Sequence, residues 1–226
     1  MAMLWFTSTA RNALAAAVVA TIAFAAFTVW WLVDGGRQLD ATMLRFTGWL
    51  LRGWVDLVIS SSWPLGEPQF GLATAATIAA VLAVRRNYRP AAVVFCGFVL
   101  MSAVQLVIVV TLAEVRHDGL GIAALVRLYP SGHTARVPFL GTVIALMAGP
   151  RVRWWILATT AVLAITVALD RTDSKIQTGS VVVGGLLLGI STALWFVTLF
   201  SAWKAESLVP KTSGGITNWT LRKGRR

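Results

Sequence analysis

The sequence predicts an all-α integral membrane protein with six transmembrane helices and one further helix at the membrane surface. Hydrophobic residues make up 57% of the 226 residues and charged residues 13%, so the mean hydropathy of +0.74 lies far above that of a soluble domain. Six apolar stretches are long enough, or nearly so, to cross a hydrocarbon core about 30 Å thick. The basic residues between these stretches gather on alternate loops, which is typical of a chain that crosses a membrane repeatedly.

The six expected spans follow one another in a single transmembrane domain, residues 1–203. They are Asn12–Val33, Gln69–Val84, Ala91–Ala113, Thr134–Ala148, Trp154–Leu169 and Ser180–Trp203. The first is expected to be a retained helix, because no small-residue cleavage site follows it. The only cysteine, Cys96, lies in the third span, which predicts an inert thiol in the core and excludes an internal disulfide. Gly185 and Gly189 predict a close-packing face on the sixth helix.

The distribution of charge predicts the orientation of the chain. With six spans, both termini and the turns near Arg85–Pro90 and Pro150–Arg153 lie on one side of the membrane. That side carries twelve basic residues and one acidic residue, which is the whole formal net charge of +11, whereas the other side has eight of each. Because basic loops stay in the cytoplasm, both termini and the basic tail, residues 204–226, are expected there, in a multi-pass plasma-membrane protein. The charge pattern describes a membrane protein, and no nucleic-acid partner is expected.

Between the first two spans, Asp40–Ser60 has the pattern of an amphipathic helix lying in the outer membrane interface. Its apolar residues cover a wide face, and its polar stripe consists of Arg45, Arg52 and Asp56. Such a helix can form a roof over a site for a lipid headgroup, and it can equally be a simple connector between two spans.

The segment Pro130–His133, of sequence Pro-Ser-Gly-His, immediately precedes the fourth span on the outer side. It places the hydroxyl of Ser131, the free N–H groups of a helix start near Gly132 and the imidazole of His133 next to one another. Together with the helix dipole these groups can bind an anion such as phosphate, and His133 can protonate a leaving oxygen. The same segment also fits a helix that Ser131 merely caps.

A second segment precedes the sixth span, where Arg171 is followed by Gln177 and Val181 and then by a glycine-rich helix. In order and spacing, this segment and Pro130–His133 resemble the type 2 phosphatidic acid phosphatase (lipid phosphate phosphatase) family. The resemblance implies a nucleophilic histidine and an orienting aspartate, at the positions where this chain has Gln177 and Val181. Because a glutamine amide nitrogen has no available lone pair, the resemblance implies a degenerate member that lacks its nucleophile.

The family also has a motif with a lysine and, seven residues later, an arginine. Here Arg116, followed by His117, ends the third span, and Val109 occupies the lysine position. The phosphate-binding pocket that the resemblance implies lies on the outer face and consists of Arg116, Ser131, Gly132, His133 and Arg171.

The main hypothesis from the sequence is a lipid-phosphate-binding pseudoenzyme, or an accessory subunit in envelope lipid metabolism. Its ligand would be a lipid phosphate or polyprenyl phosphate, and its partners membrane lipids together with a membrane protein or a second copy of this chain. One alternative is an active lipid or polyprenyl phosphate phosphatase, with His117 as nucleophile and His133 as general acid. Another is a non-enzymatic membrane scaffold or transport component. No cofactor is expected, and two histidines with one cysteine do not make a metal site.

Overall fold

The computed structural model describes residues 2–34, 36–51, 53–116 and 129–206, and the regular structure in this part of the chain is helical throughout. Six of the helices correspond to the expected spans: α1 (Ala2–Asp34), α5 (Pro68–Val84), α6 (Tyr88–Arg116), α8 (Gly132–Met147), α9 (Pro150–Asp173) and α10 (Gly179–Glu206). Three shorter helices lead from α1 to α5: α2 (Arg37–Leu50), α3 (Trp54–Ser60) and α4 (Trp63–Gly66). The prediction of an all-α fold is confirmed.

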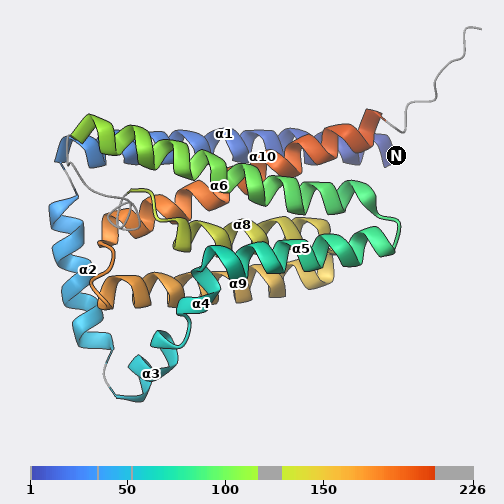
Figure 1. Ribbon diagram of the computed structural model, residues 1–226. Coiled ribbons are helices and arrows are strands. Elements are labelled where there is room, and N and C mark those ends of the chain that lie inside the picture. The colour runs from blue at the N-terminus through green and yellow to red at the C-terminus, as the bar shows by residue number, and fades with distance from the viewer. Residues whose placement is uncertain (1, 35, 52, 117–128, 207–226) are drawn as a thin grey trace, which may run out of the picture.

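The six longer helices run side by side, and α2 crosses one end of this bundle (Figure 1). The central helix is α8, which contacts α10, α9, α6, α5 and α4. Most of its residues are buried, including Phe139 and Val143, whose side chains are fully enclosed. The turns between α5 and α6 and between α8 and α9 lie at the end opposite α2 (Figure 1). The start of α8 and the ends of α6 and α9 therefore lie at the α2 end of the bundle.

Four of the described helices contain stretches long and apolar enough to cross a membrane. These stretches are Asn12–Val33, Tyr88–Leu112, Pro150–Asp173 and Gly179–Leu199. A fifth candidate is the pair Val55–Gly66 and Pro68–Val84, which is bent by 65° at its break. Large apolar side chains such as Val19, Ile22 and Val107 are exposed on the bundle, as contact with lipid tails allows. The described residues thus form an all-α membrane protein with four or five candidate spans.

The prediction of one surface helix over Asp40–Ser60 is wrong, because this segment forms two helices. The chain breaks between α2 and α3, where Gly53 has a φ of +64°. That backbone conformation suits glycine and strains other residues, and it is incompatible with a continuous right-handed helix. The amphipathic character of α2 remains, since Thr47 is buried whereas Phe46 and Trp49 are exposed.

The prediction that Cys96 is a core thiol is also wrong. Cys96 is exposed on α6, whereas Val94 and Phe98, two residues to either side, are buried. With 3.6 residues in each helical turn, position 96 lies on the face opposite positions 94 and 98. The thiol therefore faces the surroundings of the bundle.

The glycines of α10 allow this helix to lie directly against the start of α8. A side chain on Gly185 would collide with the carbonyl oxygen of Ser131, and a side chain on Gly189 with that of Ala135. Small residues permit such close approach, which membrane helices use for packing. The close-packing face predicted for the sixth helix thus lies within the bundle, next to the Pro-Ser-Gly-His segment.

Asp40 of α2 caps α10 across the end of the bundle, because its Oδ1 accepts a hydrogen bond of 2.7 Å from the N–H of Ser180. We expect Asp40→Ala to lower the free energy of unfolding by about 1 kcal/mol, since the first turn of α10 loses an acceptor. Thermal unfolding in detergent measures this loss, and Asp56→Ala, on an exposed carboxylate of α3, is the matched control. Equal melting temperatures for the two variants would contradict the capping role.

Candidate functional site

The candidate site begins at the N-terminus of α8, where Ser131 is the N-cap residue. The N–H of Thr134 donates to Ser131 Oγ at 3.3 Å, and the N–H of Ser131 donates to the carbonyl oxygen of Val181 at 3.1 Å. Because the N–H groups of Ser131 and Thr134 are engaged in this way, an anion at this helix start would meet those of Gly132 and His133.

Gln177 lies against this helix start. Its Oε1 accepts a hydrogen bond of 2.5 Å from Ser131 Oγ, and its backbone N–H donates to the carbonyl oxygen of Arg171 at 3.1 Å. Only 4% of Gln177 is exposed. The contact joins the turn between α9 and α10 to the first turn of α8, so two residues singled out in distant motifs meet at one place.

His133 is paired with Glu67, the residue between α4 and α5. Its Nε2 lies 3.2 Å from Glu67 Oε1, and the His133 side chain packs against Gly66. Burial lowers the pKa of His133; the hydrogen bond with Glu67 opposes this effect, and the charges of Arg171 and Arg136 add to it. Burial and the two arginines therefore disfavour the protonated imidazole, whereas an anion bound beside it would favour that form.

Two buried arginines complete the cationic part of the site. Arg136 of α8 donates from Nη1 to the carbonyl oxygen of Gly66 at 2.5 Å, and Arg171 of α9 donates from Nη2 to that of Trp63 at 3.4 Å. The Nε of Arg171 lies 3.3 Å from Asp170 Oδ2 as an ion pair, yet it makes no hydrogen bond to any described residue. Since Arg171 is only 5% exposed, this N–H is a buried donor that a ligand oxygen would satisfy.

The structure brings one group of the predicted residues together at the α2 end of the bundle. This group consists of Ser131, Gly132, His133, Arg171, Gln177 and Val181. Val181 contributes only its carbonyl oxygen, because its side chain packs with Trp31 and Tyr129 in an apolar cluster.

Three other predicted residues belong to the end of α6 and the chain after it. Val109 is almost fully buried within the bundle, so an apolar side chain stands where the resemblance implies a lysine. Arg116 is the last residue of α6, but its side chain lies outside the described part of the chain, and so does all of His117. The roles expected of these two residues stay predictions.

Sequence reasoning missed Glu67, and it assigned no role in the pocket to Arg136, although it placed this arginine on the outer side with His133 and Arg171. A signal existed for Arg136, because it is the only charged residue inside the six expected spans, and such residues mark functional positions in membranes. Glu67 had no such signal, since it is one of eight acidic residues on the expected outer side. Only the packing of α4 against α8 distinguishes it.

Tyr129 anchors the segment that leads into α8. Its side chain is fully buried, its ring centroid lies 4.4 Å from that of Trp31, and the rings of Phe24 and Phe27 are each 6.3 Å away. Its hydroxyl lies 2.7 Å from Thr28 Oγ1. Burial raises the pKa of Tyr129 to about 12, against the effect of this hydrogen bond, so the phenol stays protonated. A rigid aromatic contact with α1 thus precedes the capping serine.

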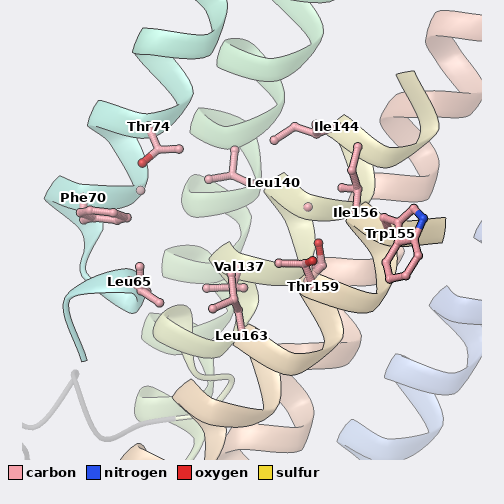
Figure 2. A pocket seen from close by; sticks show the side chains of 13 residues that line it. Leu65, Phe70, Thr74, Val137, Leu140, Ile144, Trp155, Ile156, Thr159 and Leu163 are labelled. Carbon is pink, nitrogen blue, oxygen red and sulfur yellow. The ribbon is translucent and has the colours of Figure 1, made fainter. Parts of the chain in front are cut away.

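An apolar groove of about 370 Å³ runs along α8 between α5 and α9, starting next to the site. Figure 2 shows its lining, which includes Leu65, Phe70, Val137, Leu140, Trp155, Ile156 and Leu163. Leu65 belongs to α4, and Gly71, also in the lining, packs against the side chain of Arg136. The groove therefore adjoins the cationic site through Leu65 of α4 and through Gly71, which contacts Arg136.

A smaller pocket of about 270 Å³ lies between α2 and the turn that joins α9 to α10. Its wall includes Asp40, Thr172, Lys175 and Gln177. Because Gln177 lines this pocket and also contacts Ser131, the pocket leads to the start of α8 from the side of α2.

The groups of the site are suited to binding an anion. A helix start and two buried guanidiniums provide donors for phosphate oxygens. An activated nucleophile is absent from the described part of the site, because the hydroxyl of Ser131 donates to an amide oxygen of Gln177, which is not a base. No protein-family model, curated protein or solved structure matches this chain.

Proposed function

We propose that this protein binds a lipid phosphate or polyprenyl phosphate at the α2 end of the bundle without hydrolysing it, as a pseudoenzyme or an accessory subunit in envelope lipid metabolism. The observation that carries this proposal is the 2.5 Å hydrogen bond between Ser131 and Gln177. At this position the resemblance to type 2 phosphatidic acid phosphatases implies a nucleophilic histidine. An amide that cannot attack phosphorus stands there instead, next to a helix start suited to phosphate.

The cations and the groove together favour a lipid phosphate as the ligand. Arg136 and Arg171 are buried, and Arg171 keeps an Nε–H for which a phosphate oxygen is a suitable acceptor. The apolar groove that begins beside Arg136 suits an acyl or isoprenoid chain. A molecule with its phosphate between the guanidiniums and its chain in the groove would satisfy both features.

The proposal places this site on the outer face of the plasma membrane, in a phosphatase-like bundle of six transmembrane helices. It counts α5 and the short central helix α8 as spans in addition to α1, α6, α9 and α10. The bundle end opposite α2 carries basic residues near both of its turns, namely Arg85, Arg86, Arg89, Arg151 and Arg153. The positive-inside rule assigns that end to the cytoplasm, with the two termini.

Calorimetric titration of the purified protein with dodecyl phosphate, in dodecyl maltoside, tests the proposal. We expect Arg171→Gln to bind at least about tenfold more weakly than the wild type, because a charge-assisted contact to phosphate is lost. Arg153→Gln is the matched control, since Arg153 donates to the carbonyl oxygen of Ala145 at the opposite end of the bundle. Inorganic phosphate should bind more weakly than dodecyl phosphate, because it leaves the groove empty.

The outcome also separates the alternatives. A wild-type protein that does not bind dodecyl phosphate would contradict the proposal and favour a scaffold or transport component. Binding followed by phosphate release would favour an active phosphatase, and loss of that release in His117→Ala would identify His117 as the nucleophile.

A further inference from the structure

Five consecutive residues, Trp63–Glu67, supply an acceptor to each of three basic side chains of the site. We call this segment, which consists of α4 and the residue after it, the α4 strap. Its three contacts are Arg171 Nη2 to Trp63 O at 3.4 Å, Arg136 Nη1 to Gly66 O at 2.5 Å and His133 Nε2 to Glu67 Oε1 at 3.2 Å. Two carbonyl oxygens and one carboxylate thus face the cations of the site.

These acceptors are the kind of group that a phosphate would offer to the same side chains. A phosphate presents several oxygens to guanidinium and imidazole donors, as the strap does with one carboxylate and two carbonyls. While an N–H group is hydrogen-bonded to the strap, it cannot donate to a ligand that approaches from the same side. The strap and a bound phosphate would therefore compete for Arg136, Arg171 and His133.

In the site without a ligand, carboxylates of the protein itself already balance the charges of the two arginines. The guanidiniums of Arg136 and Arg171 contribute two positive charges, and the carboxylates of Glu67 and Asp170 contribute two negative charges beside them. These four charges cancel one another, so together they offer no net positive charge to attract a dianion. Removing the carboxylate of Glu67 would leave one positive charge.

We propose that the α4 strap is an internal ligand of the phosphate site, which an incoming lipid phosphate must displace. Glu67 is then the residue that determines how much negative charge the site accepts. This inference rests on the proposed function, since it names what occupies the same site before the lipid arrives.

The position of the strap allows such a displacement. Four residues are too few for a helix to be stable on its own, and the segment Val55–Gly66, which ends with α4, is bent by 65° from α5. Trp63 is 50% exposed, so one side of the strap is in contact with the surroundings. Leu65 lines the apolar groove, and its departure with the strap would join the groove to the cationic site.

Titration of Glu67→Gln with dodecyl phosphate, at pH 8 in dodecyl maltoside, tests the inference. We expect binding about tenfold or more tighter than in the wild type, because the substitution keeps the side-chain size and removes a negative charge close to the ligand. The gain should be smaller for dihexanoyl-phosphatidylglycerol, whose phosphodiester carries one charge and is repelled less. Without any ligand, Glu67→Gln should melt at a lower temperature than the wild type, since a neutral amide oxygen binds His133 more weakly than a carboxylate does.

Glu206→Gln is the control for net charge, because Glu206 is the last residue of α10, whose end lies opposite the site (Figure 1), and the substitution should leave the affinity nearly unchanged. If the wild type binds and Glu67→Gln binds equally or more weakly, the strap is not a competitor, and the proposed function survives without it. If no variant binds dodecyl phosphate, the proposed function and this inference both fail. A gain of equal size in Glu206→Gln would assign the effect to overall charge and would also overturn the inference.

Discussion

A Gln177→His variant is expected to release phosphate from dodecyl phosphate, whereas the wild-type protein binds this lipid and releases none. Gln177 Oε1 lies 2.5 Å from Ser131 Oγ at the start of α8, so a histidine here would bring a ring nitrogen to the groups that hold the phosphate. Imidazole can attack phosphorus, and a carboxamide cannot. Loss of a nucleophile slows other enzymes by about 10⁴-fold or more, so even a partial recovery would be a large effect.

The structure gives a reason to test this substitution alone before the pair that the resemblance suggests. The side chain of Val181 packs with Trp31 and Tyr129 in an apolar cluster. A carboxylate at position 181 would lose its hydration among aromatic rings, and only the new histidine at position 177 would offset that cost. We therefore expect Gln177→His to fold like the wild type, and Gln177→His/Val181→Asp to melt at a lower temperature.

Release of inorganic phosphate by the purified proteins measures the gain. Gln177→Ala is the control, because it opens the same space beside the 270 Å³ pocket without supplying a nucleophile. If Gln177→His binds dodecyl phosphate but releases no phosphate, another departure from the family pattern must account for the inactivity. The first such position to test is Val109, where the resemblance implies a lysine. Phosphate release by the wild type would mean that Gln177 does not inactivate the site.

The all-helical, membrane-embedded character of the chain could be predicted, although not the number of its spans, because long apolar stretches identify membrane helices directly. A helix lies at each of the six expected places, and the first candidate span has the predicted bounds, Asn12–Val33. The break at Gly53 could not be predicted, because the amphipathic pattern continues through it and only the positive φ ends α2. The prediction that Cys96 is buried was wrong for a related reason. In a helix that is apolar all round, the sequence does not distinguish the face toward lipid from the face toward the core.

The candidate site was predictable where its residues are neighbours in the chain or follow a fixed spacing. Ser131 and His133 lie in one helical turn, and Gln177 was identified from its spacing to Arg171 along the sequence. Glu67 was not found, because its contact with His133 spans 66 residues and depends on the path of the chain through α3 and α4. Such contacts are specified by tertiary packing, which a local pattern of residues does not encode.

Tyr129→Ala is expected to destabilise the protein by about 3–5 kcal/mol, the range measured when a buried aromatic side chain is truncated. Tyr129 is fully buried, and its ring stacks on Trp31 at 4.4 Å between centroids, with Phe24 and Phe27 beside it. Its removal would leave a cavity between α1 and the start of α8. Because the chain passes directly from Tyr129 into the cap of α8, we also expect the affinity for dodecyl phosphate to fall.

Tyr129→Phe separates the packing of the ring from the hydrogen bond of its hydroxyl. Thr28 Oγ1 donates to the carbonyl oxygen of Phe24 at 2.8 Å, so in the contact with Tyr129 it acts as the acceptor. The phenylalanine variant therefore loses one neutral hydrogen bond without stranding a donor, and its melting temperature should fall by the equivalent of only about 1 kcal/mol. Thermal unfolding and dodecyl phosphate titration of both variants, well below their melting temperatures, test the anchor. If Tyr129→Ala keeps the wild-type affinity for dodecyl phosphate while it is folded, the aromatic cluster stabilises the bundle but does not position the site. If only Tyr129→Phe keeps that affinity, the ring holds the cap of α8 in place.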